Sequence, residues 1–323
     1  MKFTKEIIHL TNLPEVVDQI VNELKAGVHQ TMRRKGAVVG ISGGIDSSVS
    51  LALSVKAFGA DKVVGIMLPE KDSSPDSAML AQKLADTYGI KTLTENITAA
   101  LDGFGCYRRR DEAVSAVFPE YNPTTYKMKI GVKQNNLNQN LPPVFFLTIV
   151  DPDGKEFSKM LPPNEYLQIV ASSNFKQRCR MSMLYYHAER LHYAVIGTPN
   201  KHEVEQGFFV KYGDGGADIM PIGKLYKTQV YQLAKYLSVP QEIIDRTPTT
   251  DTYTAEQTQE EFFYQLPFHQ MDILWYAFEN KSPLKEVASE MKMTEEEIEK
   301  IFSNFTRKQL TTDYLRMSPI HIS

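Results

Sequence analysis

The sequence predicts an α/β protein with a doubly wound, mostly parallel sheet, a β-hairpin-containing insertion and a helical C-terminal region. Two observations support this prediction. Short apolar runs alternate with segments of helical periodicity, and a turn rich in Gly and Ser directly follows the first apolar run. In this class of fold, ligands bind at the carboxyl ends of the strands. We expect residues 1–323 to form a single domain.

Helices and strands are expected to alternate in chain order. Residues 14–34 place apolar side chains at helical spacing, and the apolar run 37–41 is typical of a buried parallel strand. The expected elements that follow are a helix at 47–58, a strand at 63–68, a helix at 76–88 and a strand at 91–94. The same rhythm returns as a helix at 174–190, a strand at 193–197 and a helix at 226–237.

The alternation is interrupted between about residues 107 and 166, where prolines and Asn-rich tracts punctuate the chain. Within this stretch, residues 144–150 and 155–160 have strand character, and Asp151-Pro-Asp-Gly154 joins them as a hairpin turn. We interpret the stretch as an insertion into the α/β core. One interpretation is that the insertion is a surface decoration without a role in function. The other is that it covers the bound substrate or forms a dimer contact.

The C-terminal region, from about 255 to 323, is expected to be helical. Two short helices are predicted at 283–291 and 294–302, and Thr294 is a suitable N-cap because acidic residues follow it.

Bulk composition excludes several classes of partner. The net charge of -3 gives no basic field for nucleic acid or for an acidic membrane surface, and no apolar run approaches membrane-spanning length. The chain has only two cysteines, Cys106 and Cys179, which do not make a disulfide framework. We therefore expect a cytoplasmic protein that binds neither nucleic acid nor membrane.

The strongest local motif is Gly40-Ile-Ser-Gly-Gly-Ile-Asp-Ser-Ser48, between a predicted strand and a predicted helix. Glycines let the backbone approach a ligand, and the free N–H groups at the helix start point towards an anion. Asp46 is acidic where phosphate is expected, so a bridging Mg²⁺ is the natural explanation. The alternative is an ordinary turn with Asp46 as a helix cap. The motif is neither a Walker A loop nor a dinucleotide fingerprint.

This Ser-Gly-Gly-x-Asp-Ser motif resembles the pyrophosphate loop of the N-type ATP pyrophosphatases, which have an adenine nucleotide alpha hydrolase-like fold. The resemblance implies that ATP is a co-substrate, cleaved between its α and β phosphates, and that an adenylated intermediate forms. The loop residues implied to bind ATP are Gly40, Ile41, Ser42, Gly43, Gly44, Ile45, Asp46 and Ser47.

A second group of motifs resembles the NAD synthase family. Residues 196–203 contain Gly-Thr followed by a Glu, and residues 207–227 contain Lys-Tyr-Gly-Asp-Gly-Gly-Ala-Asp and a distal Lys. Residues 174–181 resemble the family's Asn-x-x-x-Arg-x-Arg-Met helix, and residues 247–251 resemble its Pro-Thr/Ser-Ala-Asp element.

The resemblance implies roles at the ATP end of the site. Glu203 matches the second Mg²⁺ carboxylate, which it would share with Asp46, and Lys227 matches the lysine that meets the phosphates. Thr198 and Thr249 match positions that contact ATP. The plainer alternatives are a solvated helix carboxylate for Glu203 and helix caps for the threonines.

Three further residues, Arg178, Lys211 and Asp218, match positions that bind deamido-NAD in the family. For Arg178 the alternative is a surface salt bridge. Asp214 is implied to position the ammonia or a nearby loop, and its alternative is a turn cap. The catalytic residues implied by the resemblance are Asp46, Lys227 and Asp214.

The implied reaction is the amidation of deamido-NAD. The substrate carboxylate attacks the α-phosphorus of ATP, and ammonia then converts the acyl-adenylate to the amide and AMP. Ammonia is the expected nitrogen donor because the α/β core begins near residue 36, which leaves no room for a glutaminase domain. The resemblance also implies a homodimer.

Three departures from the family pattern keep alternatives open. The segment after Asp251 is aromatic, the C-terminal His-Lys-Arg motif is represented only by Arg316, and the insertion lies close in sequence to Arg178. The alternatives are an ATP pyrophosphatase that amidates a different carboxylate, and a non-catalytic ATP-binding protein of the same fold.

Overall fold

The computed structural model describes residues 3–132, 144–249, 253–255, 257–259, 263–264 and 266–322. Its strands are β1 Ala37–Gly40, β2 Val63–Met67, β3 Lys91–Thr94, β4 Lys127–Val132, β5 Phe145–Val150, β6 Glu156–Met160 and β7 Ala194–Ile196. Its first helices are α1 Leu13–Lys25, α2 Ile45–Phe58, α3 Pro75–Tyr88, α4 Thr98–Gly103, α5 Cys106–Val117 and α6 Pro163–Leu191. The later helices are α7 Lys201–Gln206, α8 Lys227–Tyr236, α9 Gln241–Ile244, α10 Phe268–Glu279, α11 Leu284–Met291 and α12 Glu295–Arg316.

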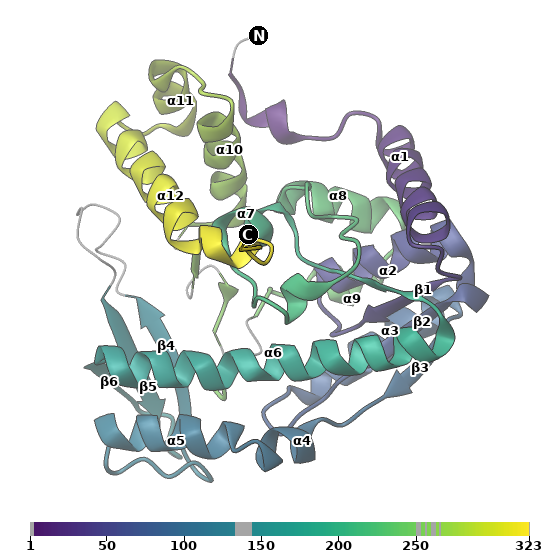
Figure 1. The fold of residues 1–323 in the computed structure, drawn as a ribbon. Coiled ribbons are helices and arrows are strands. Elements are labelled where there is room, and N and C mark those ends of the chain that lie inside the picture. The colour runs from purple at the N-terminus through teal and green to yellow at the C-terminus, as the bar shows by residue number, and fades with distance from the viewer. Residues whose placement is uncertain are drawn as a thin grey trace.

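The predicted doubly wound sheet is confirmed. Four parallel strands lie in the order β3-β2-β1-β7, and β1 pairs with both β2 and β7. Side chains of one face, such as Val39, pack with α1, α2 and α8 in one core. Side chains of the other face, such as Val38, pack against Leu184 of α6. Figure 1 shows α6 running beneath the sheet and α1, α2 and α8 above it.

The insertion contains the predicted hairpin and more. Strands β5 and β6 are antiparallel and are joined at Asp151–Gly154, where Gly154 has a φ of 81°. A third strand, β4, pairs with β5, and α5 precedes it; neither element was predicted. The sheet has its own apolar core, built from residues such as Ile130 and Leu147 together with Ile169 of α6.

The long helix α6 begins at Pro163, although the sequence predicted its start near residue 174. Proline favours the first position of a helix, because its missing N–H is not needed there. The added turns pack against the insertion, where the rings of Phe145 and Tyr166 stack with their centroids 4.1 Å apart. Helix α6 therefore joins the insertion to the main sheet.

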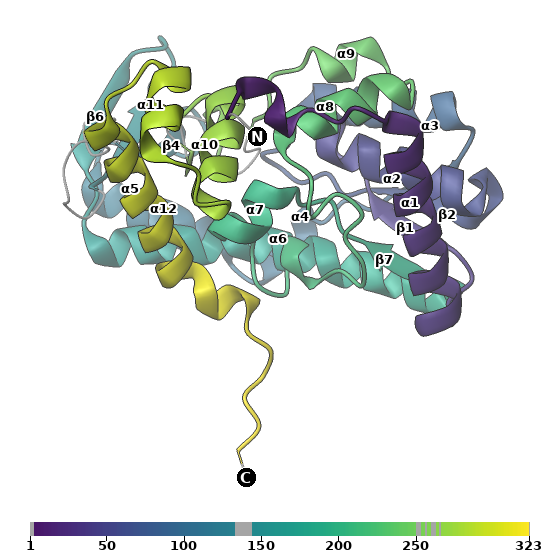
Figure 2. The same ribbon diagram turned by 90° about the horizontal axis from the view of Figure 1, so that it is seen from above.

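The C-terminal region is helical, as predicted. Thr294 caps α12, since its hydroxyl accepts from the N–H of Glu297 while the Glu297 carboxylate accepts from the N–H of Thr294. Helix α12 does not end near residue 302 but continues to Arg316. The guanidinium of Arg316 donates to the carbonyls of Val204 and Glu205, which fixes the helix end on α7. Figure 2 shows the last residues extending away from the body of the molecule.

No helix in the described part of the chain is long and apolar enough to cross a membrane.

Candidate active site

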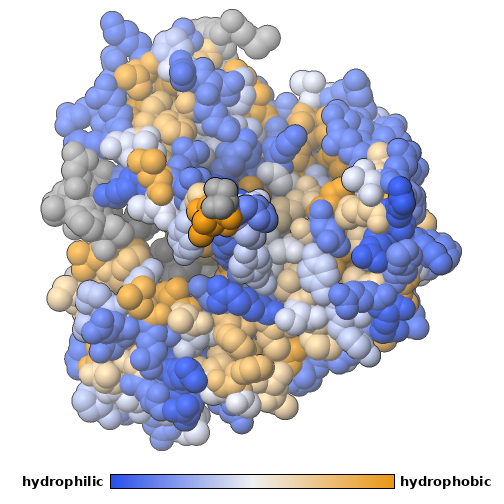
Figure 3. Space-filling view, viewed as in Figure 1, coloured by the Kyte–Doolittle hydropathy of each residue, from blue (hydrophilic) through white to orange (hydrophobic). Residues whose placement is uncertain are grey.

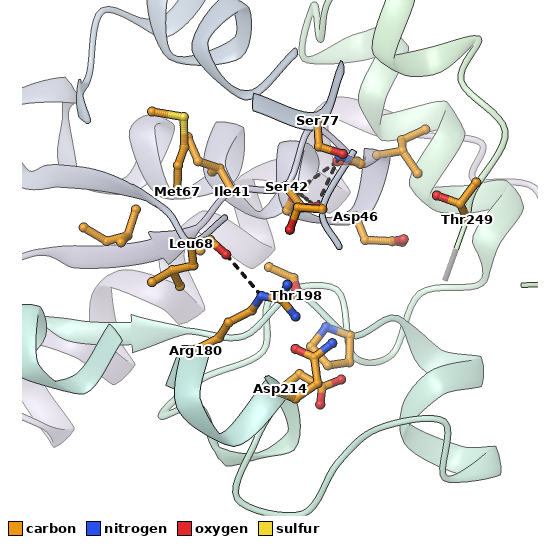
Figure 4. Close-up of a pocket in the computed structure, with 18 of the residues that line it drawn as sticks. Ile41, Ser42, Asp46, Met67, Leu68, Ser77, Arg180, Thr198, Asp214 and Thr249 are labelled. Carbon is orange, nitrogen blue, oxygen red and sulfur yellow. Dashed lines mark hydrogen bonds between the residues drawn. The ribbon is translucent and has the colours of Figure 1, made fainter. Parts of the chain in front are cut away.

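A cavity of about 300 Å³ lies at the carboxyl ends of β1, β2 and β7. The loop after β1 forms one wall, α6 forms another, and the loop after β7 forms a third. Figure 4 shows Ser42 and Asp46 from the first wall, Arg180 from the second, and Thr198 from the third, all directed towards one space. The site therefore occupies the edge of the sheet at which a doubly wound fold binds its ligands.

The Gly- and Ser-rich loop is held in shape by its own hydroxyl groups. The Ser47 and Ser48 hydroxyls donate to the carbonyl of Gly44, and the Ser42 hydroxyl accepts from the N–H of Gly44. Gly43 has a φ of 72°, and a Cβ at this position would lie 2.8 Å from both Leu80 and the carbonyl of Ser77. Only glycine suits this turn, because α3 passes so close to it.

Asp46 lies in the first turn of α2 and faces Lys227, the first residue of α8. Their side chains form a salt bridge between Lys227 Nζ and Asp46 Oδ2, and the Asn200 amide donates to Asp46 Oδ1 at 3.3 Å. Lys227 is fully buried. Burial alone would lower the pKa of Lys227, but the carboxylates of Asp46 and Glu203 raise it above its ordinary value, so the amine stays charged.

Glu203 also lines the cavity, from the short helix α7. Asn200 caps that helix, and the N–H of Asn200 donates to Glu203 Oε2 at 2.8 Å. Burial, and then repulsion from Asp46, raises the pKa of Glu203 to about 8. Burial is the larger cause of this rise, and the negative charge of Asp46, which lines the same cavity, adds to it.

This carboxylate pair fits a magnesium ion. Among the described residues, no group of three or more His, Cys, Asp or Glu is placed to hold a metal. Mg²⁺, however, is commonly bound by one or two carboxylates that share it with substrate phosphate oxygens. Asp46 and Glu203 supply two carboxylates beside the loop and in the same cavity.

The predicted residues Thr198, Thr249 and Asp214 also line the cavity. Asp214 Oδ1 accepts from the N–H of Val210 at 2.8 Å, so its carboxylate stabilises the turn as well as facing the cavity. Burial raises the pKa of Asp214 to about 6. Lys227 does not line the cavity itself and reaches it through Asp46.

Several polar residues of the cavity were not predicted. Gln177 and Arg180 of α6, Ser77 of α3, and Arg246 all line it. Arg180 Nε donates to the carbonyl of Leu68 at 3.4 Å, and the guanidinium of Arg246 donates to the Ser77 hydroxyl at 3.0 Å. Arg180 is the second arginine of the Arg-x-Arg-Met motif, which was the available signal. Gln177 occupies an unspecified position of the same motif, and Ser77 and Arg246 come from segments that only the tertiary fold brings to the site.

Arg178, Lys211 and Asp218 do not line this cavity. Lys211 lines a second cavity of about 400 Å³, beside Gly215, Gly216 and Arg316. Arg178 Nε donates to the carbonyl of Lys211 at 3.2 Å. The carboxylate of Asp218 accepts from the N–H of Val195 and from the Tyr185 hydroxyl.

The turn at residues 213–216 separates the two cavities. Asp214 faces the first cavity, and Gly215 and Gly216 face the second. The C-terminal segment borders the second cavity, because the amine of Lys211 donates to the carbonyls of Tyr314 and Met317 at 2.8 Å. Of the three residues matched to the carboxylate substrate, only Lys211 lines this second cavity, across the turn from Asp214, whereas Arg178 and Asp218 line neither cavity.

Comparison with known proteins decides the family. The NAD synthase family model matches residues 16–141 and 121–313. This chain belongs to the NAD synthase family. It is 48% identical over 308 residues to the NH(3)-dependent NAD(+) synthetase of Mesorhizobium japonicum, covering 94% of this chain and 95% of that protein. It is 44% identical over 302 residues to the enzyme of the same name from Rhizobium meliloti, covering 94% and 90%.

Solved structures show that the fold is that of NAD synthases. An NMN synthetase from Francisella tularensis superposes with a TM-score of 0.64 at 24% identity, over 97% of this chain and 99% of that one. The NH3-dependent NAD synthetase of Campylobacter jejuni gives a TM-score of 0.63 at 20% identity, over 97% and 100%. These two likenesses concern the fold alone.

Proposed function

We propose that this NAD synthase family member is an ammonia-dependent ligase that amidates deamido-NAD, with ATP converted to AMP and pyrophosphate. The observation that carries the proposal is the ion pair between Lys227 and Asp46 of the pyrophosphate loop, with Glu203 lining the same cavity as Asp46. The named reaction of the Mesorhizobium and Rhizobium relatives, NH(3)-dependent NAD(+) synthesis, supports the choice of substrate and nitrogen donor.

The reaction follows from how the site distributes charge. A carboxylate oxygen of deamido-NAD attacks the α-phosphorus of ATP, and the bond from that phosphorus to the bridging oxygen breaks. Pyrophosphate leaves with the electron pair, and Lys227 and the loop N–H groups stabilise its charge. The ammonia lone pair then attacks the acyl carbon, AMP leaves, and one proton is released. No side-chain nucleophile is needed, because positioning and charge stabilisation supply the rate.

Magnesium fits the site as part of this proposal. Asp46 and Glu203 would hold the ion, which would neutralise phosphate charge during attack and departure. The fit rests on the two carboxylates that line the same cavity beside the loop, since Mg²⁺ is commonly held by one or two carboxylates together with phosphate oxygens.

The two cavities suggest where each substrate binds. We place ATP in the first cavity, against residues 40–47, Thr198 and Thr249, and deamido-NAD towards Arg178, Lys211 and Asp218. Asp214 faces the ATP cavity from the turn between the two, which suits it to position ammonia at the acyl carbon.

The proposal includes a cytoplasmic homodimer. Each chain would form a single domain over residues 1–323, with an insertion at about 107–166 and a helical extension at about 255–323. Both cysteines are free, which suits a reducing compartment. Ile320 and Ile322 are 76% and 95% exposed. Figure 3 shows a group of hydrophobic side chains where Figure 1 marks the C-terminal end, and a second copy of the chain would cover such side chains.

One assay tests the reaction. The protein is incubated with ATP, Mg²⁺, ammonium and deamido-NAD, while pyrophosphate and NAD are followed. We expect one pyrophosphate for each NAD. Pyrophosphate release that depends on another carboxylic acid would contradict the substrate assignment. No release with any acid would support a non-catalytic ATP-binding protein instead.

A further inference from the structure

A chain of hydrogen bonds, buried in its middle, connects the C-terminal helix α12 to the start of α8. Lys308 Nζ donates to Gln206 Oε1 at 3.4 Å, and Gln206 Nε2 contacts His202 Nδ1 at 3.2 Å. His202 Nε2 contacts Asp272 Oδ1 at 2.5 Å. Asp272 then accepts from the N–H of Lys227 at 3.3 Å and, through Oδ2, from the N–H of Thr228 at 2.7 Å.

The donors and acceptors along this chain agree in direction. The amine of Lys308 donates to Gln206 Oε1 and to the carbonyl of Phe263, so Gln206 presents its oxygen to Lys308 and its NH₂ group to His202. His202 Nδ1 must therefore accept, which places the ring proton on Nε2, facing Asp272. Asp272, as a carboxylate, accepts all three bonds. Gln206, His202 and Asp272 have no solvent exposure, so the bonds among these three residues form away from water.

Asp272 bonds to the start of α8, where two positive charges lie close together. Lys227 is a buried cation at the first position of α8, and the partial positive charge of a helix start disfavours a cation there. The carboxylate of Asp272 is bonded to the first two N–H groups of the helix and offsets that charge. It thereby fixes the backbone from which Lys227 reaches Asp46 at the phosphate loop.

The same chain also fixes the neighbour of Glu203. His202 and Gln206 belong to α7, the helix that presents Glu203 to the cavity. Asp272 thus bonds to both elements that supply charge to the phosphate site: α7 through His202, and α8 through its N–H groups. Helix α12 joins the arrangement through Lys308.

We propose that Asp272 is a positioning residue for Lys227, and that His202, Gln206 and Lys308 hold it in place. Asp272 lines neither cavity, so it acts through Lys227 and not by touching ATP. This inference rests on the proposed function, since it assigns Lys227 to the departing pyrophosphate. A lysine displaced by a fraction of an ångström still allows ATP to bind but stabilises the transition state less well.

The test compares kcat with the KM for ATP. In His202→Leu the donor to Asp272 is lost, whereas in His202→Gln the side-chain Nε2 can reproduce it. We expect kcat to fall about 10- to 100-fold in His202→Leu and in Asp272→Asn, with the KM for ATP changed less than about 3-fold. In His202→Gln, kcat should return to within about 3-fold of the wild type. Ile273→Val, a buried change on the same helix outside the chain, should lower the melting temperature and leave kcat unchanged.

Each outcome decides one question. A wild-type protein that releases no pyrophosphate would contradict the proposed function itself. With an active wild type, an unchanged kcat in folded His202→Leu would overturn the positioning role. The positioning role would also be overturned if kcat were as low in His202→Gln as in His202→Leu. It would be overturned as well if Ile273→Val lowered kcat along with the melting temperature. If Asp272→Asn does not fold, the His202 pair alone decides.

Discussion

Arg178 and Arg180 lie two residues apart on α6 but face different parts of the site. Arg180 lines the first cavity, in which we place ATP, and Arg178 supports the backbone of Lys211 at the second cavity. Both belong to the same motif, and sequence alone favoured Arg178 for substrate contact. The structure assigns a separate position to each arginine.

The two arginines are expected to differ in which substrate they affect. Arg180→Gln should raise the KM for ATP about 10-fold, because it removes a cation from the cavity in which we place the phosphates of ATP. Arg178→Gln should leave the KM for ATP nearly unchanged and raise that for deamido-NAD. Steady-state kinetics with each substrate varied in turn measures both values, and each variant is the control for the other. Identical effects on both substrates would contradict the separation.

Asp46 is expected to matter for chemistry and little for folding. Asp46→Asn keeps the size of the side chain but removes the charge that pairs with Lys227 and would hold Mg²⁺. We expect at least about a 100-fold loss of pyrophosphate release. Circular dichroism should show an unchanged fold. A fully active Asp46→Asn protein would refute the metal role.

At the scale of elements, a buried ion cluster joins the loop after β2 to α5 and α6. Lys176 of α6 binds Glu70 at 2.9 Å and Asp72 at 2.7 Å, and Arg110 of α5 also binds Asp72. Burial alone would raise the pKa of Asp72, but Lys176 and Arg110 lower it below its usual value. Ser73, in the same loop, lines the first cavity, so the cluster connects the insertion to the candidate site.

Removing a cation from this cluster should strongly destabilise the folded protein. Lys176→Met is expected to lower the free energy of unfolding by about 3–5 kcal/mol, because it leaves two buried carboxylates without one of their cations. Lys129→Met removes the exposed pair with Glu156 and should cost less than about 1 kcal/mol. Urea unfolding of both variants gives the comparison. Equal losses would show that the cluster does not hold the loop.

Element prediction succeeded where the pattern was local and failed where packing decided. The strands of the parallel sheet and Thr294 as a helix cap follow from short apolar runs and from capping chemistry. The early start of α6 at Pro163 and the late end of α12 at Arg316 do not. The first depends on the sheet formed by β4, β5 and β6, and the second depends on carbonyls of α7, so neither is encoded in the local periodicity.

The residues of the candidate site also fall into two groups, those that a local motif predicted and those that only the tertiary fold brings to the cavity. The loop, Asp46, Glu203 and Lys227 were found from motifs, and the fold brings them together. Ser77, Arg246 and Gln177 carry no motif of their own. They line the cavity only because α3, the segment after α9 and α6 converge on the carboxyl end of the sheet.

At the scale of the whole molecule, the burial of Glu203, together with repulsion from Asp46, should make the stability of the fold depend on pH. The folded protein raises the pKa of Glu203 from 4.5 to about 8, so between these values the folded state binds more protons than the unfolded state. Without Mg²⁺, the free energy of unfolding should therefore fall as pH rises from about 4.5 to about 8, by up to about 1.4 kcal/mol per pH unit.

Magnesium should reverse this loss. Because the ion requires an ionised carboxylate, the increase in melting temperature on adding Mg²⁺ and ATP should be larger at pH 8 than at pH 6. Thermal unfolding at several pH values measures this increase. Glu203→Gln is the control and should remove both the loss of stability and the pH dependence of its recovery. A Mg²⁺ effect that does not vary with pH in the wild type would contradict the assignment.

The length of α6 has a consequence for protein engineering. The helix has 29 residues, about 43 Å at about 1.5 Å per residue, and Ile169 near its start belongs to the core of the inserted sheet. Excising the insertion alone would leave the first turns of the helix with a bare apolar face and an aggregation-prone product. A minimal version of this ligase would have to shorten α6 together with the sheet, or carry a redesigned polar face on those turns.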